Sequence, residues 1–126
     1  MEIVIGKGEI HMEFYNQHYP VEYLIFYCKN TEEAKKYLDT NDIWTEALAQ
    51  YPGFVSSTSY INLDNPGEVR IVIIWETLEQ WLAIPKENLM KIAKEFDEKF
   101  GLEYKNGPRL HNENNFGYHK VLHYER

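Results

Sequence analysis

The chain has 126 residues and a net charge of −7, with 44% hydrophobic and 26% charged residues. This length suits one domain with a sizeable core, and the composition is that of an ordinary globular protein. The acidic balance and the lack of a Lys/Arg cluster argue against nucleic acid and anionic membranes as partners.

The compartment is predicted from cysteine usage and from the beginning of the sequence. Cys28 is the one cysteine, so no internal disulfide can form, which favours a reducing environment. Residues 1–6 show no basic segment that leads into a long apolar stretch, so we expect no signal peptide. No apolar run approaches the ~18 residues of a membrane span. We therefore expect a cytoplasmic protein with no membrane partner.

Residues 1–19 are predicted to form a β-hairpin appendage. Apolar and polar residues alternate on both sides of the Gly6-Lys7-Gly8 turn, as in short antiparallel strands. Residues 20–126 are then the single main domain.

The main domain begins with an apolar strand at 21–28, which is followed by a helical pattern that starts at Asn30 or Thr31. An apolar stripe continues to Tyr51, and Thr40-Asn41-Asp42 is a poor helical triplet that predicts a break or kink. Pro52-Gly53 ends the helix.

Two further strands are expected at 54–63 and 69–76, joined by the strong turn sequence 64–67. A capping-box pattern at Thr77 predicts a short helical turn, and apolar spacing predicts a second long helix over 85–100 that Gly101 ends. Residues 102–117 have no period and are predicted to be a long connection. Tyr118–Tyr124 is the expected last strand.

This order, strand-helix-strand-strand-helix-strand, predicts an α+β, ferredoxin-like βαββαβ fold with two helices on one face of a four-stranded antiparallel sheet. The strands at 21–28 and 69–76 are apolar at both odd and even positions, which indicates burial on both faces. Two helices can cover only one face. We therefore expect a homodimer, in which a second copy covers the other face.

Two segments resemble a known family. They are Ile43 to Phe54, read IWTEALAQYPGF, and Trp75 to Trp81, read WETLEQW, with Ile84-Pro85 after it. The resemblance is to a small uncharacterised family, known mostly from cyanobacterial genomes, in the antibiotic-biosynthesis-monooxygenase-like group of dimeric α/β barrels. It covers about residues 21–100 and the last strand. It implies the barrel dimer and no established activity.

The wider superfamily implies several activities. Some relatives oxidise phenolic or quinol-like substrates with O₂ and no cofactor, others degrade haem, and others are not known to be enzymes. The haem-degrading branch uses an Asn on the first strand and a His near the second helix. The strand at 21–28 has no Asn and the helix at 85–100 has no His, which argues against haem degradation.

Cofactor-free oxygenation requires an apolar pocket, a base and hydrogen-bond donors that hold an anion. Asn41, on an otherwise apolar stripe, is the candidate donor, although a kink or helix-capping residue is the more common explanation. His119 or His123 is the candidate base, although a surface or hydrogen-bonded strand histidine is the more common explanation for each. The candidate pocket-lining residues, which plain core packing also explains, are Trp44, Tyr60, Trp75, Trp81 and Tyr124.

We expect no metal and no cofactor. His119 and His123 lie ~13 Å apart on one strand, too far to share an ion. His11 and Glu13 are closer but have no evident third ligand. Cys28 is expected to be a buried structural thiol.

Two hypotheses remain open. One is a cofactor-independent monooxygenase-like enzyme that acts on a small aromatic or polyketide-like molecule. The other is a non-catalytic dimer that binds a small hydrophobic ligand or has a regulatory role.

Overall fold

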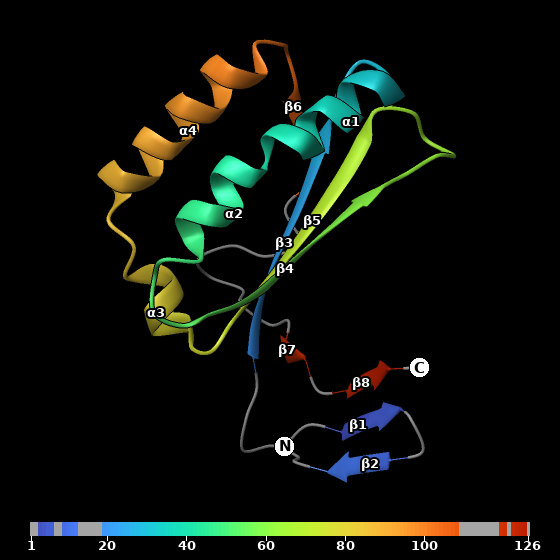
Figure 1. Ribbon diagram of the computed structural model, residues 1–126, viewed down its shortest axis with the longest axis vertical. Helices are drawn as coiled ribbons and strands as arrows, with labels where there is room; N and C mark the ends of the chain where they lie inside the picture. The colour runs from blue at the N-terminus through green and yellow to red at the C-terminus, as the bar shows by residue number, and fades with distance from the viewer. Residues whose placement is uncertain (1–2, 7–8, 13–18, 109–118, 121, 126) are drawn as a thin grey trace.

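The computed structural model describes residues 3–6, 9–12, 19–108, 119–120 and 122–125. Its main layer is an antiparallel sheet in the order β4-β5-β3-β6, and the helices cover one face of it (Figure 1). This is the strand order of the ferredoxin-like fold, so the predicted fold class is confirmed. The strands and helices of this body are β3 (Tyr19–Tyr27), α1 (Thr31–Thr40), α2 (Asp42–Leu48), β4 (Phe54–Ile61), β5 (Glu68–Trp75), α3 (Leu78–Leu82), α4 (Lys86–Phe100) and β6 (Lys105–Asn106).

The helix boundaries follow from local capping chemistry. The Asn30 side chain accepts a 2.9 Å hydrogen bond from the backbone N–H of Glu33 at the start of α1. The Thr77 hydroxyl accepts one of 3.1 Å from the Gln80 N–H at the start of α3, as the capping-box pattern predicts. Gly101 ends α4 in the left-handed conformation, with φ 68°. The predicted break in the first helix is also confirmed, because α1 and α2 are separate helices on either side of Asn41.

The last strand differs from the prediction. Instead of one strand over Tyr118–Tyr124, the structure has β7 (His119–Lys120), which pairs with β3, and β8 (Leu122–Glu125), which pairs with β1. Two-residue β6 lies within the predicted connection and pairs with the other end of β3. The fourth position of the sheet is thus occupied by short pieces, because the pattern after Gly101 has no strand-length apolar run.

The predicted hairpin is present as β1 (Ile3–Gly6) and β2 (Glu9–Met12), paired antiparallel with Ile5 opposite Ile10. Strand β8 adds to β1 in parallel, so the two ends of the chain meet in a small three-stranded sheet. Figure 1 shows this sheet below the main body.

The two faces of the main sheet have different surroundings. Val69, Ile71, Ile73 and Trp75 of β5 are buried beneath the helices, together with Phe96 and Phe100 of α4. The alternate residues face the other way, onto what we call the open face. Its apolar residues on β3 and β5 are the buried Ile25 and the half-buried Val21, Tyr23, Tyr27, Val72 and Ile74. Apolar side chains on both faces agree with the sequence pattern.

Within the described part of the chain, no helix is long and apolar enough to cross a membrane. The same residues contain no cluster of three or more His, Cys, Asp or Glu side chains that could hold a metal ion.

Candidate functional site

Asn41 joins α1 to α2 and is buried, with 5% of its surface exposed. Its backbone N–H donates to the carbonyl oxygens of Tyr37 and Leu38, at 2.9 and 3.2 Å. The side-chain Nδ2 lies 3.5 Å from the Thr45 hydroxyl oxygen, at the outer limit of a hydrogen bond. The backbone is therefore well bonded, and Thr45 uses little of the capacity of the buried carboxamide to donate.

Three of the predicted pocket residues lie on the helix-covered side of the sheet. Trp75 is fully buried, and its ring meets that of Phe54 edge-on at 5.7 Å between centroids. Trp44 and Trp81 are half-buried and pack against the same core. The three tryptophans thus belong to the core between the helices and the sheet, and Asn41 is buried at the junction of α1 and α2.

Tyr60 does not join them. It lies opposite Arg70 in the pairing of β4 with β5, and residues directly opposite in an antiparallel pair share a face. Arg70 alternates with the buried Ile71, so Tyr60 is on the open face, where it is 54% exposed. The sequence pattern does not show this, because the face depends on the register between strands.

The predicted base and Tyr124 fall in the short C-terminal strands. The backbone of His119 pairs with Pro20 in β7, whereas His123 pairs with Val4 and Tyr124 with Ile5 in β8. The two histidines therefore belong to different pairings. Their side chains lie outside the described residues, so their role as a base stays a prediction.

Glu22 is a carboxylate in the interior layer that the sequence analysis does not single out. It lies opposite Ile73 and so faces the helices. Its Oε1 accepts a hydrogen bond of 3.3 Å from the indole Nε1 of Trp75. The sequence signal that could have identified Glu22 is a single acidic residue within an otherwise apolar strand.

The other described ionisable groups of the interior are held in their neutral forms. Burial raises the pKa of Tyr37 far above its usual value. Burial and a 2.7 Å hydrogen bond to Asp97 raise the pKa of Tyr104 to about 12. Burial and the charge of Glu33 raise the pKa of the Cys28 thiol. Near neutral pH none of the three acts as a base or an anionic nucleophile, which agrees with a structural role for Cys28.

The open face carries a cavity of about 650 Å³. It lies where β4 runs into the turn at 62–67, and its walls come from three strands and that turn. Its lining residues include Tyr23, Tyr60, Ile61, Leu63, Arg70 and Val72. Sequence analysis missed this cavity, because it exists only when the three strands are set side by side.

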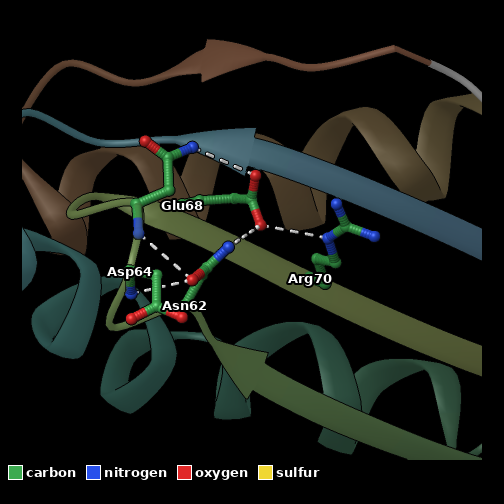
Figure 2. A network of polar contacts seen from close by, with 5 residues as sticks. Asn62, Asp64, Glu68 and Arg70 are labelled. Atoms are coloured by element: carbon green, nitrogen blue, oxygen red, sulfur yellow. Dashed lines mark hydrogen bonds and ion pairs between the residues drawn. The ribbon is translucent and has the colours of Figure 1, made fainter.

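A polar network surrounds the buried Glu68 at the edge of this cavity (Figure 2). Its carboxylate, 5% exposed, accepts hydrogen bonds from Asn62 Nδ2 at 3.0 Å, Asn65 Nδ2 at 3.2 Å and Arg70 Nε at 3.1 Å. The side-chain Oδ1 of Asn62 accepts hydrogen bonds from the backbone N–H groups of Asp64 and Asn65, at 2.9 and 3.1 Å. The turn and the Arg70 side chain are thereby held in place together.

Hydrogen bonds from Asn62, and then from Arg70 and Asn65, lower the pKa of Glu68 against the opposing effect of burial. A lowered folded-state pKa stabilises the fold above the unfolded-state pKa, and this contribution is lost as the pH falls through the folded-state value. We therefore expect Glu68→Gln to destabilise the protein at neutral pH and to flatten the acid limb of its stability profile. Urea unfolding between pH 7 and 3 measures this effect, with Glu95→Gln on exposed α4 as the control for loss of one charge. Parallel profiles for wild type and Glu68→Gln would contradict it.

A second, smaller cavity of about 530 Å³ lies where β3 ends, beside Cys28 and Tyr104. Its charged lining residues are Lys29, Glu33, Glu103 and Lys105, which balance in sign.

No protein-family model and no curated protein matches the sequence, so the predicted membership in a small cyanobacterial family stays a prediction. Solved structures do match. One is a monooxygenase from the gene ActVA-Orf6 of Streptomyces coelicolor, in complex with the ligand Nanaomycin D. It is 18% identical over 73% of this chain and 80% of that chain, with a TM-score of 0.55.

A second match is SnoaB, a cofactor-independent oxygenase from Streptomyces nogalater. It is 14% identical over 77% of this chain and 97% of that chain, with a TM-score of 0.52. At these identities the likeness concerns the fold. The chain therefore shares the fold of these two proteins, as its sequence predicts.

Proposed function

We propose that two copies of the chain form a homodimeric α/β barrel in the cytoplasm, which acts as a cofactor-independent monooxygenase on a small aromatic or polyketide-like molecule. The observation that supports the proposal is the buried Asn41 carboxamide, whose donor capacity is little used, in a fold shared with two oxygenases. In this proposal residues 20–126 form the barrel unit and residues 1–19 are an appendage to it.

The dimer is supported by the apolar open face, which the helices leave uncovered. A stable interface buries about 800 Å² on each partner. At ~25 cal/mol per Å² that area corresponds to tens of kcal/mol before the costs of association. Sedimentation velocity distinguishes the 15.1 kDa monomer from its dimer.

The proposed reaction oxidises an activated ring carbon. A base removes a proton from the CH₂ group of an anthrone-type substrate, and the resulting anion passes one electron to O₂. The substrate radical and superoxide then combine to a carbon hydroperoxide, which loses water. The net change is CH₂ + O₂ → C=O + H₂O, so one oxygen atom enters the product and the other leaves as water.

Each residue has a separate role in this proposal. The Asn41 amide donates a hydrogen bond to the substrate oxygen on which negative charge develops. Trp44 and Trp81 form the walls that hold the flat ring, and Trp75 closes the pocket toward the sheet. His119 or His123 is the proposed base.

The test is O₂ uptake with 1,8-dihydroxyanthrone, with formation of the anthraquinone followed by absorbance. We expect Asn41→Ala to lower kcat about 100-fold, the usual cost of one oxyanion donor, with little change in KM. Asn88→Ala is the matched control, because Asn88 is a half-buried amide that donates to the Tyr51 hydroxyl at 3.0 Å. Equal turnover by wild type and Asn41→Ala would remove Asn41 from the mechanism. No turnover above the protein-free rate would remove the oxygenase proposal.

The alternative is a dimer that binds a small ligand without catalysis. It is favoured by the raised pKa values of Tyr37, Tyr104 and Cys28, because none of these interior groups can serve as the base. Saturable binding of 1,8-dihydroxyanthraquinone without turnover of the anthrone would support this alternative.

A further inference from the structure

Glu22 is a half-buried acid between apolar residues on the same face of β3. It lies opposite Ile73, which is buried beneath the helices, so Glu22 is on the helix-covered face of the sheet. The indole Nε1 of Trp75 donates a hydrogen bond of 3.3 Å to its Oε1. A carboxylate can accept about four hydrogen bonds, so the bond from Trp75 does not exhaust it.

Trp75 reaches Glu22 along a diagonal of the sheet. It lies two positions beyond Ile73, the residue directly opposite Glu22. Residues related in this way are ~7–8 Å apart at their Cα atoms, and long or aromatic side chains can span that distance. The hydrogen bond between Trp75 and Glu22 is a contact of this kind.

His119 occupies the corresponding diagonal position in the pairing of β3 with β7 (Figure 1). It lies opposite Pro20, two residues before Glu22. Pro20 is buried and shares the helix-covered face with Glu22, because alternate residues of a strand lie on one face. The pairing therefore places His119 on this face as well, at a diagonal from Glu22.

The neighbouring cation and the other candidate base have different positions. Lys120 lies opposite Tyr19, so it belongs to the other face of this strand pair. His123 lies opposite Val4 in β8, which is part of the small three-stranded sheet. Of the two candidate bases, it is therefore His119 that the strand register brings to Glu22.

From this register we propose that Glu22 and His119 form a carboxylate–histidine pair, in which Glu22 positions His119 as the base of the reaction proposed above. The base role rests on the proposed function, whereas the pair itself rests on the strand pairing. A carboxylate that accepts one ring N–H fixes the tautomer of the imidazole and leaves the other nitrogen to accept a proton. Trp75 holds Glu22 in turn, so Glu22 is a positioning residue and His119 is the catalytic one.

The proton leaves and returns within one turnover. It moves from the substrate CH₂ group to the second ring nitrogen of His119, and the electron pair of the C–H bond stays on the substrate carbon. The Glu22 carboxylate stabilises the imidazolium that forms. After the substrate radical and superoxide combine, the imidazolium returns the proton to the peroxide anion. The hydroperoxide then loses water, so His119 ends neutral and no reductant is needed.

NMR titration of the histidine ring protons in the full chain tests the pair without any substrate. A nearby carboxylate favours the charged imidazolium, so we expect Glu22→Gln to lower the pH midpoint of the His119 titration by about one unit. The signals of the other histidines should not move, and His119→Gln identifies the signal of His119. Glu95→Gln, which removes an exposed charge from α4, is the matched control and should leave all midpoints unchanged. An unchanged His119 midpoint in Glu22→Gln would overturn the pair.

O₂ uptake with 1,8-dihydroxyanthrone tests the base role. We expect Glu22→Gln and His119→Gln each to lower kcat about 100-fold with little change in KM, and the double variant to lose no more than either. The amide of Glu22→Gln can still accept the Trp75 N–H, and His119→Gln provides an independent test if Glu22→Gln fails to fold.

Equal kcat for wild type and Glu22→Gln, beside a shifted titration, would overturn the positioning role. No turnover by the wild type would remove the oxygenase proposal and the base role with it, whereas the titration would still decide whether the pair exists.

Discussion

Replacing Gly67 by Ala is expected to lower the free energy of unfolding by at least about 3 kcal/mol. Gly67 has φ 95°, a conformation that residues with a Cβ rarely adopt. An added Cβ would press against the carbonyl oxygen of Cys28 and lie 3.0 Å from its carbon. The Gly67 carbonyl oxygen also accepts a hydrogen bond of 2.7 Å from the Cys28 N–H. A backbone movement that relieves the clash would therefore break this hydrogen bond, which joins the end of β3 to the turn.

Gly101→Ala is the matched control for this prediction. Gly101 is also left-handed, with φ 68°, but the nearest atom to an added Cβ is the Glu98 carbonyl oxygen at 3.9 Å. Gly101→Ala should lower the free energy of unfolding only by the strain of a left-handed alanine, about 1–2 kcal/mol. Urea unfolding measures both variants. Equal losses at the two glycines would show that the contact with Cys28 has no effect.

Trp75→Ala is expected to destabilise the fold by about 3–5 kcal/mol, because it removes a large side chain that is fully buried against its neighbours. Trp75 is fully buried at the end of β5, where it packs edge-on against Phe54 and donates to Glu22. The substitution also removes the indole donor that satisfies part of the Glu22 carboxylate.

Thermal and urea unfolding measure this loss, with Leu82→Ala as the control. Leu82 lies nearby in sequence on α3 and is 55% exposed, so its truncation should change the unfolding free energy by less than about 0.5 kcal/mol. A loss of under about 1 kcal/mol at Trp75 would contradict the prediction.

Local signals in the sequence predicted the elements whose boundaries depend on neighbouring residues. Asn30 and Thr77 begin helices because their side chains bond the first free N–H groups, and Gly101 ends one because it tolerates positive φ. The break at Asn41 was predicted in the same way. These features depend on residues within four positions of each other.

Other features depend on strands that are far apart in the sequence. The face occupied by Tyr60 follows from its pairing with Arg70, and the position of Glu22 beside Trp75 bridges 53 residues. A periodic pattern does not specify such a register. Two-residue β6 was missed, and the division of the predicted last strand into β7 and β8 was not foreseen, for a related reason: β6 and β7 are held by their partner β3 and carry no pattern of their own.

Strand β4 is an edge of the described main sheet, and its central residues are hydroxyl-bearing: Ser56, Ser57, Thr58 and Ser59. An edge strand exposes unpaired backbone groups that can recruit a strand from another molecule and start aggregation. Small polar side chains and the irregular register between Phe54 and Ser56 make this edge a poor template for such growth. The apolar residues of the sheet therefore lie on its faces and not along the centre of this edge. This arrangement disfavours fibre-like aggregates that grow by edge-to-edge pairing of strands at high protein concentration.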